Sequence, residues 1–450
     1  MRADDDTIAA IATPPGKGAI AIVRISGRSV RDLCTRLVRS KEALEPRVAT
    51  RATVLDETGR PLDRGIALLF SAPASYTGED LLELQVHGSP VVAREIVRAL
   101  IACGVRPADP GEFTRRAFLN GKMDLHEAEA IADVIDAESR SAARAALANL
   151  GGGLAAEVRM LRSALAGVLE ELAAAIDFPD EVPEPDPARL DAALAPIVAN
   201  LERLRADGER GRLVREGLTA AIVGPPNAGK SSLLNALLGE DRAIVSEIAG
   251  TTRDSIEESV AIRGVRVRLV DTAGIREHAD RLEAAGIERT QRALASARIA
   301  IVVIDGSAPL GTESRHLLAA TRNRMRVIFF NKADLGDAGA REFGDSAAII
   351  GSTWNPVSLG AVRDAVAHVG WGGESPDLER PHLAALREFA AVGEALEALT
   401  DARKTLAGGE PTDFIAGDLE RAFSALGHVS ERVAAEEVLD GIFARFCIGK

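Results

Sequence analysis

Aromatic residues and cysteines are scarce in this sequence. Phe, Trp and Tyr make up only 3% of the 450 residues, so the hydrophobic core must consist mainly of aliphatic side chains. The three cysteines, Cys34, Cys103 and Cys447, are too few and too widely spaced for a disulfide framework, a zinc ribbon or a Cys-x-x-Cys pair. The scarcity and spacing of cysteine therefore exclude small disulfide-rich proteins and zinc sites built on cysteine.

The chain also lacks a long apolar run and a recognisable targeting segment. No run approaches the roughly 18–20 consecutive apolar residues that a membrane-spanning helix needs. The N-terminus, MRADDDTIAA, is acidic where a signal peptide carries positive charge. We therefore expect a cytoplasmic protein.

Positive charge is in deficit. The 54 Lys and Arg residues face 67 Asp and Glu residues, which gives a net charge of −13. Such a chain is unsuited to coating nucleic acid non-specifically, because phosphate binding uses clustered Lys and Arg. The first 60 residues reverse this balance, with eleven basic residues against eight acidic ones. Any contact with nucleic acid is therefore expected to be local or shared with a partner.

The first half of the chain contains two regions with different patterns. Residues 1–120 carry short β-like runs divided by Gly and Pro turns, which predicts a small α+β domain. Residues 121–216 carry Ala- and Leu-rich stretches with apolar residues at helical spacing, which predicts the first part of a helical domain. An acidic, Pro-rich linker at 179–187 interrupts these helices.

The second half changes pattern twice more. In residues 217–373, apolar runs alternate with helical patterns, which predicts an α/β domain with a mostly parallel sheet. The helical pattern returns in residues 374–450. The economical interpretation is an α/β domain inserted between two halves of one helical domain, although a string of four domains is the alternative. The predicted strands of the α/β domain lie at 219–223, 265–270, 299–304, 327–330 and 347–350.

The strongest chemical signal is the segment Gly224-Pro-Pro-Asn-Ala-Gly-Lys-Ser231. It matches the phosphate-loop pattern G-x-x-x-x-G-K-[ST] and stands between an apolar strand and the helical run SLLNALLG. Glycines allow backbone N–H groups to wrap around a phosphate, and the helix N-terminus adds a positive dipole. Lys230 would place its charge on the β- and γ-phosphates, and the Ser231 hydroxyl would bind Mg²⁺. A chance Gly-rich turn is the alternative, which the strand–loop–helix context disfavours.

Three further motifs stand in the order that a GTPase requires. Asp271–Gly274 (DTAG) ends a predicted strand, where an Asp holds Mg²⁺ through water and a Gly N–H senses the γ-phosphate. Asn331–Asp334 (NKAD) ends another, and its Asp carboxylate accepts two N–H bonds from guanine. Between the phosphate loop and DTAG lies Gly250–Asp254 (GTTRD), which can lend a hydroxyl to Mg²⁺. Because adenine presents the wrong donors to the Asp of NKAD, the Asn331–Asp334 motif selects GTP over ATP.

Two residues narrow the mechanism of hydrolysis. Ile275 follows Gly274, so the water-positioning Gln that small Ras-like GTPases carry there is missing. Asn227 lies inside the phosphate loop, where its side-chain oxygen and backbone carbonyls of Ser246 and Ile248 could hold a monovalent cation. Such an ion would stabilise the charge that an arginine finger otherwise stabilises.

With these motifs, the sequence resembles the MnmE (TrmE) family of tRNA-modification GTPases. The phosphate-loop segment, IAGTTRD, DTAG and NKAD resemble its G domain. The resemblance extends to ATPPGKGAIAIVRISG at 12–27, TGEDLLELQVHG at 77–88, and PGEFTRRAFLNGKMDLHEAEAIADVIDA at 110–137. The terminal FCIGK, residues 446–450, resembles the family's C-terminus, so the likeness spans nearly the whole chain.

The resemblance implies a Ras-like P-loop G domain and an enzyme that acts on tRNA. A flavin-containing partner, MnmG (GidA), would form a heterotetramer with a homodimer of this chain. The complex would add an aminomethyl-type (carboxymethylaminomethyl) group to C5 of the wobble uridine of certain tRNAs. The N-terminal domain would bind the one-carbon donor, a 5-formyl- or 5,10-methylene-tetrahydrofolate, and mediate dimerisation. The G domain would be activated by K⁺ and would dimerise across its nucleotide faces with GTP bound.

Matching the motifs residue by residue assigns the remaining ligands. The resemblance implies folate contacts at Arg24, Glu83, Lys122 and Lys450. It implies K⁺ ligands at Asn227, Ser246, Ile248 and Thr251, and Mg²⁺ ligands at Ser231 and Thr252. It implies that Glu283 helps to orient the attacking water.

The residues around GTP form the largest predicted set, and one stretch of them departs from the family. Where the family shows Ser-Ala-Arg or Ser-Ala-Lys, this chain has Ser352-Thr353-Trp354. The sequence therefore does not predict how tightly guanine is bound, but Asp334 still fixes the identity of the base. The predicted GTP contacts are Asn227, Ala228, Gly229, Lys230, Ser231, Ser232, Ser246, Glu247, Ile248, Ala249, Gly250, Thr251, Thr252, Asp271, Thr272, Ala273, Gly274, Asn331, Lys332, Ala333, Asp334, Ser352, Thr353 and Trp354.

Each assignment outside the phosphate loop has an ordinary structural alternative. Arg24 on a strand is commonly half of a surface ion pair, and Glu83 fits the outer face of an alternating strand. Lys122 fits a helix start, and Glu283 fits the exposed side of a charged helix. Cys447 in an apolar run is more often a packed small side chain than a nucleophile, so we assign it no role.

The apolar character of the C-terminus predicts that this end of the chain docks rather than frays. The residues concerned are Ile442, Phe443, Phe446 and Ile448. If the tail docks on the N-terminal domain of a dimer partner, Lys450 reaches a folate beside Arg24.

Two classes of function remain open from sequence. The first is the tRNA-modifying enzyme, and the second is a regulatory GTPase switch of the ribosome-assembly type without modification chemistry. The segments at 12–27 and 446–450 favour the first, since an assembly GTPase has no reason to carry a folate site. Folate binding by the purified chain would discriminate between them.

Overall fold

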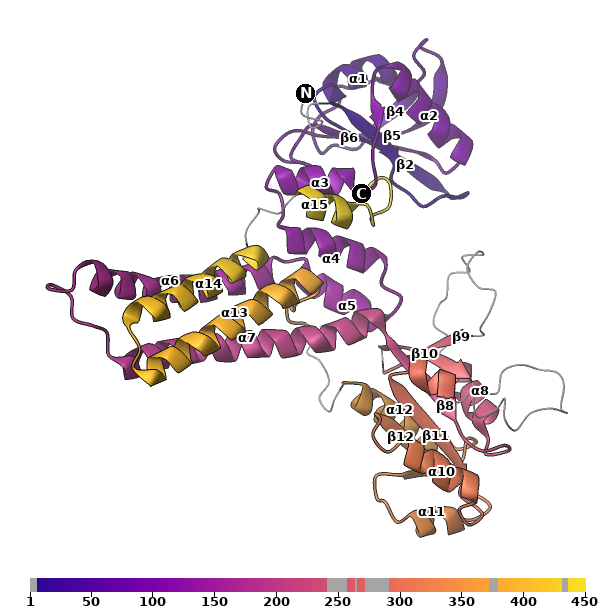
Figure 1. The fold of residues 1–450 in the computed structure, drawn as a ribbon. Coiled ribbons are helices and arrows are strands. Elements are labelled where there is room, and N and C mark those ends of the chain that lie inside the picture. Colours follow the sequence, from indigo (N-terminus) through magenta and orange to yellow (C-terminus); the bar gives the residue numbers. More distant parts are fainter. Residues whose placement is uncertain (1–5, 241–256, 264, 272–290, 372–378, 431–435) are drawn as a thin grey trace. The chain divides into compact units, whose positions relative to one another are not determined.

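The computed structural model describes residues 6–240, 257–263, 265–271, 291–371, 379–430 and 436–450 (Figure 1). The chain forms two compact units, each built from several segments. The first comprises residues 1–132, 154–178 and 416–450, and the second comprises 133–153 and 179–415. The four predicted domain boundaries, 1–120, 121–216, 217–373 and 374–450, stay predictions.

The first unit contains a seven-stranded sheet with the order β3-β4-β5-β6-β2-β1-β7. Neighbouring strands are antiparallel except β1 and β7, which are parallel. The strands are β1 (Ile8–Ile11), β2 (Ile20–Ser26), β3 (Val38–Ser40), β4 (Thr50–Leu55), β5 (Pro61–Phe70), β6 (Leu81–His87) and β7 (Arg106–Pro107).

Two helices, α1 (Val30–Leu37) and α2 (Pro90–Ala102), pack against this sheet. Alternate strand residues such as Val23, Ala52 and Leu84 are buried with the apolar side chains of these helices in one core. The strand residues between them point away from that core and are partly or fully exposed, as Arg51 is. The predicted α+β fold of the N-terminal region is therefore confirmed.

A second core in this unit joins the N-terminal region to the C-terminus. Phe118 and Leu125 pack with Phe443 and Phe446, which follow one another closely at the end of the chain. Phe443 and Phe446 also stack in a tilted pair with ring centroids 5.5 Å apart. The helices concerned are α3 (Glu112–Leu119), α4 (Leu125–Ile135) and α15 (Glu436–Phe443).

Long helices occupy both units. Arg162 of α6 (Gly153–Asp177) lies over the ring of Phe423 of α14 (Thr412–Ser430), with 4.2 Å to the centroid. Within the second unit, α7 (Pro187–Glu216) and α13 (Leu386–Gly408) run side by side (Figure 1), and Arg403 forms an ion pair with Asp191. The predicted linker at 179–187 separates α6 from α7, and α7 ends at Glu216 as predicted.

The second unit also contains a six-stranded sheet with the order β13-β12-β11-β8-β10-β9. All neighbours are parallel except β10 and β9, so the predicted mostly parallel sheet is confirmed. The strands are β8 (Leu218–Val223), β9 (Glu257–Ile262), β10 (Val265–Asp271), β11 (Ile299–Asp305), β12 (Arg326–Asn331) and β13 (Ile349–Ile350). Strand β9 was not among the predicted strands, and β13 is shorter than predicted.

Helices cover both faces of this sheet, which explains why its central strands are continuous apolar runs. Ala220 and Ile222 of β8 pack in the same core as Leu233 of α8. Ala221 and Val223 face the other core. The helices around the sheet are α8 (Lys230–Glu240), α10 (Thr312–Ala320), α11 (Ala338–Phe343) and α12 (Pro356–Trp371), while α5 (Arg140–Asn149) belongs to the helical part of this unit.

The order of the strands brings the predicted motifs together. Strands β8, β10, β11 and β12 are parallel neighbours, so their carboxyl ends lie at one edge of the sheet. In open α/β sheets, ligands bind at this edge. None of the described helices is both long and apolar enough to span a lipid bilayer.

Candidate nucleotide-binding site

The loop between β8 and α8 has the backbone shape of a phosphate cradle. Asn227 and Gly229 both adopt positive φ angles, of 62° and 98°. Such residues turn successive N–H groups toward one side of the loop. The Nζ of Lys230, the first residue of α8, donates to the carbonyl oxygens of Gly224 and Pro225, each at 2.8 Å. The Lys230 side chain therefore folds back over the loop, across the space in which a phosphate would lie.

Asn331 ties this loop to the opposite side of the site. Its Nδ2 donates to the carbonyl oxygen of Ala228 at 3.0 Å, and its Oδ1 accepts from the N–H of Thr353 at 3.0 Å. The side chain is 2% exposed, so both bonds are shielded from water. One buried amide therefore fixes the distance between the phosphate loop and the loop that carries Trp354.

The loop after β12 is held by a second set of contacts. Lys332, with a φ of 62°, donates from Nζ to Oδ2 of Asp305 at 2.6 Å. Burial alone would raise the pKa of Asp305, but hydrogen bonds from Lys332 and Ser307 lower this pKa below its ordinary value. The N–H of Ala333 donates to the carbonyl oxygen of Gly351 at 2.9 Å. These contacts fix the backbone on either side of Asp334.

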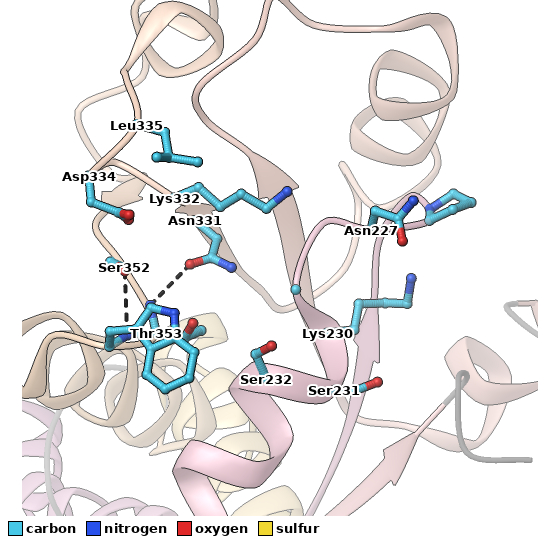
Figure 2. Close-up of a pocket in the computed structure, with 13 residues that line it drawn as sticks. Asn227, Lys230, Ser231, Ser232, Asn331, Lys332, Asp334, Leu335, Ser352 and Thr353 are labelled. Atoms are coloured by element: carbon cyan, nitrogen blue, oxygen red, sulfur yellow. Dashed lines mark hydrogen bonds between the residues drawn. The ribbon is translucent and has the colours of Figure 1, made fainter. Parts of the chain in front are cut away.

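A pocket of about 610 Å³ lies between the two loops (Figure 2). This volume is within the range usual for sites that enclose small molecules. Figure 2 shows Lys230, Ser231 and Ser232 on the phosphate-loop side, and Asn331 and Asp334 on the other. The remaining lining residues are Pro226, Asn227, Gly229, Lys332, Leu335, Ser352, Thr353 and Trp354.

The structure thus brings together most of the described residues that the sequence assigns to GTP. Of the lining residues, Pro226 and Leu335 alone were not among those predicted. Ala228 is buried, and it contributes the carbonyl oxygen that Asn331 binds. Ala333 contributes its backbone contact with Gly351.

Several predicted residues lie outside the described part of the chain. Asp271 ends β10 at the carboxyl edge of the sheet, and the structure describes its backbone alone. The predicted residues outside the described ranges are Ser246, Glu247, Ile248, Ala249, Gly250, Thr251, Thr252, Thr272, Ala273, Gly274 and Glu283.

Two of the four predicted folate residues form an ion pair in the first unit. Arg24 of β2 pairs in register with Glu83 of β6, and Nη2 lies 2.8 Å from Oε1. The Arg24 guanidinium also lies over the rings of Tyr76 and Phe113, 5.4 and 5.7 Å from their centroids. Lys122 donates from Nζ to a backbone carbonyl, that of Pro73, at 3.1 Å.

The C-terminal tail reaches the same ion pair from within the chain. The carbonyl oxygen of Gly449 accepts from Arg24 at 3.3 Å, and that of Lys450 accepts from the N–H of Phe113 at 3.1 Å. Burial and the neighbouring Arg24 lower the pKa of Lys450. The predicted docking of the tail is therefore observed, on the N-terminal domain of its own chain, while docking on a dimer partner stays a prediction.

Sequence reasoning missed three residues that shape these sites. Asp305 ends β11 beside β12, and an acid at the carboxyl end of a buried parallel strand was a usable signal. Tyr76 and Phe113 come from loops and helices distant in sequence from Arg24. No periodicity or spacing links them to it, so only the fold could have shown their contact with the guanidinium.

Comparison with known proteins covers the whole chain. A family model described as the GTP-binding protein TrmE N-terminus matches residues 7–122, and one described as the MnmE helical domain matches residues 125–447. A protein of Moorella thermoacetica called tRNA modification GTPase MnmE is 41% identical, covering 99% of this chain and 100% of its own. Proteins of the same name from Akkermansia muciniphila and Thermotoga maritima are 42% and 40% identical, with 100% and 99% of this chain covered and 100% of each relative.

Gly229→Ala is expected to abolish measurable GDP binding. A Cβ at this position would lie 2.1 Å from Nδ2 of Asn331, and the φ of 98° is strained for any residue with a Cβ. The substitution would therefore break the Asn331–Ala228 bond and reshape the phosphate loop. Isothermal titration with GDP measures the loss.

Gly239→Ala is the matched control, because Gly239 lies in helix α8 and the added Cβ would meet nothing within 4 Å beyond the backbone of its own helix. This variant should bind GDP as the wild type does. Equal affinities for all three proteins would show that the contact between Gly229 and Asn331 does not shape the site.

Proposed function

Because this chain belongs to the MnmE family of tRNA modification GTPases, we propose that GTP binds in the pocket between the phosphate loop and the Asn331–Asp334 loop. The observation that carries the proposal is the pocket itself. It places the Lys230 ammonium on one side and the Asp334 carboxylate on the other, as the two ends of a guanine nucleotide require. Hydrolysis of this GTP then drives the modification of a wobble uridine in tRNA.

Each lining residue has a definable part in binding. The Lys230 ammonium exchanges its two carbonyl partners for phosphate oxygens, which neutralises charge without a change of fold. The Ser231 hydroxyl and, outside the described part, Thr252 would hold Mg²⁺, which supplies positive charge to the β- and γ-phosphates. Glu283, also outside the described part, would orient the attacking water.

Base selection and base affinity come from different residues. Asp334 accepts the two N–H groups of guanine. Trp354 is 86% exposed and Leu335 is 72% exposed, although both line the pocket. A base entering the pocket would cover their apolar surface, and stacking on an aromatic ring contributes roughly 1–3 kcal/mol per base. We therefore expect Trp354 to supply affinity where the family usually has Arg or Lys.

Asp334→Asn should shift the preference of the pocket from GTP toward xanthosine triphosphate. The variant leaves one acceptor where guanine offers two donors, and an unpaired polar group costs about 1–3 kcal/mol. The sequence contains two tryptophans, Trp354 and Trp371. In a Trp371→Phe background, fluorescence therefore reports binding at Trp354 directly.

Asp337→Asn serves as the control, since Asp337 precedes α11 and is absent from the pocket lining. It should retain the wild-type preference for GTP. If Asp334→Asn also retains the full wild-type preference, Asn331–Asp334 is not the element that reads the base.

We also propose that K⁺ activates hydrolysis at this site. The support is the placement of Asn227, which adopts a left-handed backbone conformation in the phosphate loop and lines the pocket. Its side-chain oxygen can ligate a cation against the phosphates, with Ser246, Ile248 and Thr251 from outside the described part. The cation would supply the positive charge that an arginine finger supplies in other GTPases. Ile275 stands where small Ras-like GTPases have the Gln that positions water, so hydrolysis here needs other means.

GTP turnover should be at least about tenfold faster in K⁺ than in Na⁺, because Na⁺ is too small to span the same oxygens. Asn227→Ala should remove most of this difference. Asn235→Ala, exposed on α8, is the control that should keep it. Equal wild-type turnover in matched K⁺ and Na⁺ buffers would contradict the proposal.

A tetrahydrofolate site in the first unit completes the proposed chemistry. The support is the cluster in which Arg24, Glu83 and Lys450 meet beside Tyr76. The guanidinium and the ammonium can bind the acidic glutamate of a folate, and the folate would supply the one-carbon unit. The presence of this cluster favours a modification enzyme over the alternative, a regulatory GTPase switch without modification chemistry.

Deletion of Cys447–Lys450 should weaken folate binding and abolish tRNA modification. It removes the Lys450 ammonium and the Gly449 carbonyl that Arg24 binds, and it leaves Phe113 without its backbone acceptor. GTP turnover should stay near normal. Cys447→Ser, which keeps the tail, is the control. Unchanged folate affinity in the deletion variant would remove the tail from the site.

The proposed partners rest on family membership alone. They are a second copy of this chain and the flavin-containing MnmG, together forming a heterotetramer that takes tRNA as substrate. Sedimentation of the chain alone and mixed with MnmG measures these stoichiometries. The cytoplasmic location stays a prediction.

A further inference from the structure

Three arginines share the exposed face of the N-terminal sheet. Arg39 of β3 pairs in register with Thr53 of β4, and Thr53 pairs with Arg64 of β5. Arg51 lies two residues before Thr53 and therefore on the same face. All three arginines are exposed, whereas Ala52 between Arg51 and Thr53 is buried in the core. We call this surface, made of Arg39, Arg51, Thr53 and Arg64, the arginine face.

The guanidinium groups of the arginine face form no hydrogen bond or ion pair with any described residue. Other arginines of the same domain are engaged. Arg31 binds Asp80, and Arg106 binds Glu112. The contrast matters because like charges on neighbouring strands are destabilising. The arginine face nevertheless carries three positive charges that no described side chain neutralises, although the chain as a whole has a net charge of −13.

The acids of the adjoining hairpin do not neutralise this surface. Asp56 accepts from the N–H groups of Thr58 and Arg60 at the turn, at 2.9 and 2.8 Å. Asp63 accepts from the N–H of His87 and contacts its ring. The third acid of the hairpin, Glu57, lies in the turn beyond β4 rather than within a strand. The strand surface between these groups is left basic.

We propose that the arginine face binds the phosphate backbone of the RNA substrate. This inference rests on the proposed function, which supplies tRNA as the polyanion. Guanidinium groups match phosphate oxygens in two-point contacts, and three on one open face can engage neighbouring phosphates of one strand. The Thr53 hydroxyl, between Arg39 and Arg64, adds a donor of the kind that commonly contacts phosphate.

The surface suits a polyanion better than a protein. Protein interfaces centre on clusters of buried aromatic or aliphatic anchors. On this face Ile66, which is 41% exposed, lies opposite Arg51 and two residues from Arg64, so charged side chains surround it. A second copy docked symmetrically on the same surface would set these arginines against like charges. RNA supplies the opposite charge along its whole length.

The test measures binding of an unmodified tRNA transcript to the full chain over a range of KCl concentrations. Arg39→Gln/Arg64→Gln should weaken binding roughly ten- to hundredfold at low salt. It should also make the plot of log K against log salt shallower by about 2, because two phosphate contacts are lost. Arg39→Lys/Arg64→Lys keeps the charges and should retain most of the affinity.

Arg94→Gln/Arg98→Gln is the matched control. It removes the same charge from α2, which packs on the opposite face of the sheet. An equal loss of affinity and slope in both double variants would show a general charge effect and overturn the proposal. The proposal would also be overturned if the wild type forms a dimer and only the arginine-face variant is monomeric, because the face would then be a surface between two copies of the chain.

GTP turnover of the same proteins separates the two levels of inference. Wild-type chain that hydrolyses GTP but shows no salt-dependent binding of the transcript would overturn the arginine face and leave the GTPase in place. Wild-type chain without GTP turnover would overturn the proposed function instead, whatever the salt dependence. Normal turnover in the Gln variant, with weakened RNA binding, is the expected result.

Discussion

The buried side chain of Asn331 is the constraint on which the nucleotide site depends. A parallel sheet brings the ends of β8 and β12 to one edge, but it does not set the shape of the loops that follow them. The Asn331 amide does this by bonding one loop through Ala228 and the other through Thr353. It occupies space that only a glycine at position 229 leaves free. Sheet order, loop conformation and the asparagine therefore depend on one another.

The tail plays a comparable part in the N-terminal site. Pro110 bridges to Ile448, and the Cβ of any residue replacing Gly111 would lie 2.7 Å from the carbonyl oxygen of Phe443. Such close backbone packing fixes the last residues against the start of α3. The end of the chain is therefore packed on the domain that its beginning forms, which brings Lys450 near Arg24.

How much of the fold and of the sites the sequence could predict depends on how far apart along the chain the interacting residues lie. The phosphate loop and NKAD were predictable because each is a short motif at a strand end, and the strands were visible as apolar runs. Strand β9 was not predicted, because it is an antiparallel edge strand whose sequence, EESVAI, begins with three polar residues and so does not read as an apolar run. The contacts of Arg24 with Tyr76 and Phe113 join residues far apart in sequence. No local pattern encodes them.

The distribution of arginine partners carries the same reasoning one step further. Near the two sites, basic side chains are held by internal acceptors: Lys332 by Asp305, and Arg24 by Glu83. Such pairing fixes geometry, which a small ligand needs, at the expense of free charge. The arginines of β3, β4 and β5 have charge without fixed geometry. That combination suits a large polyanion, whose many phosphates tolerate variation in position but whose affinity depends on how many charges it meets.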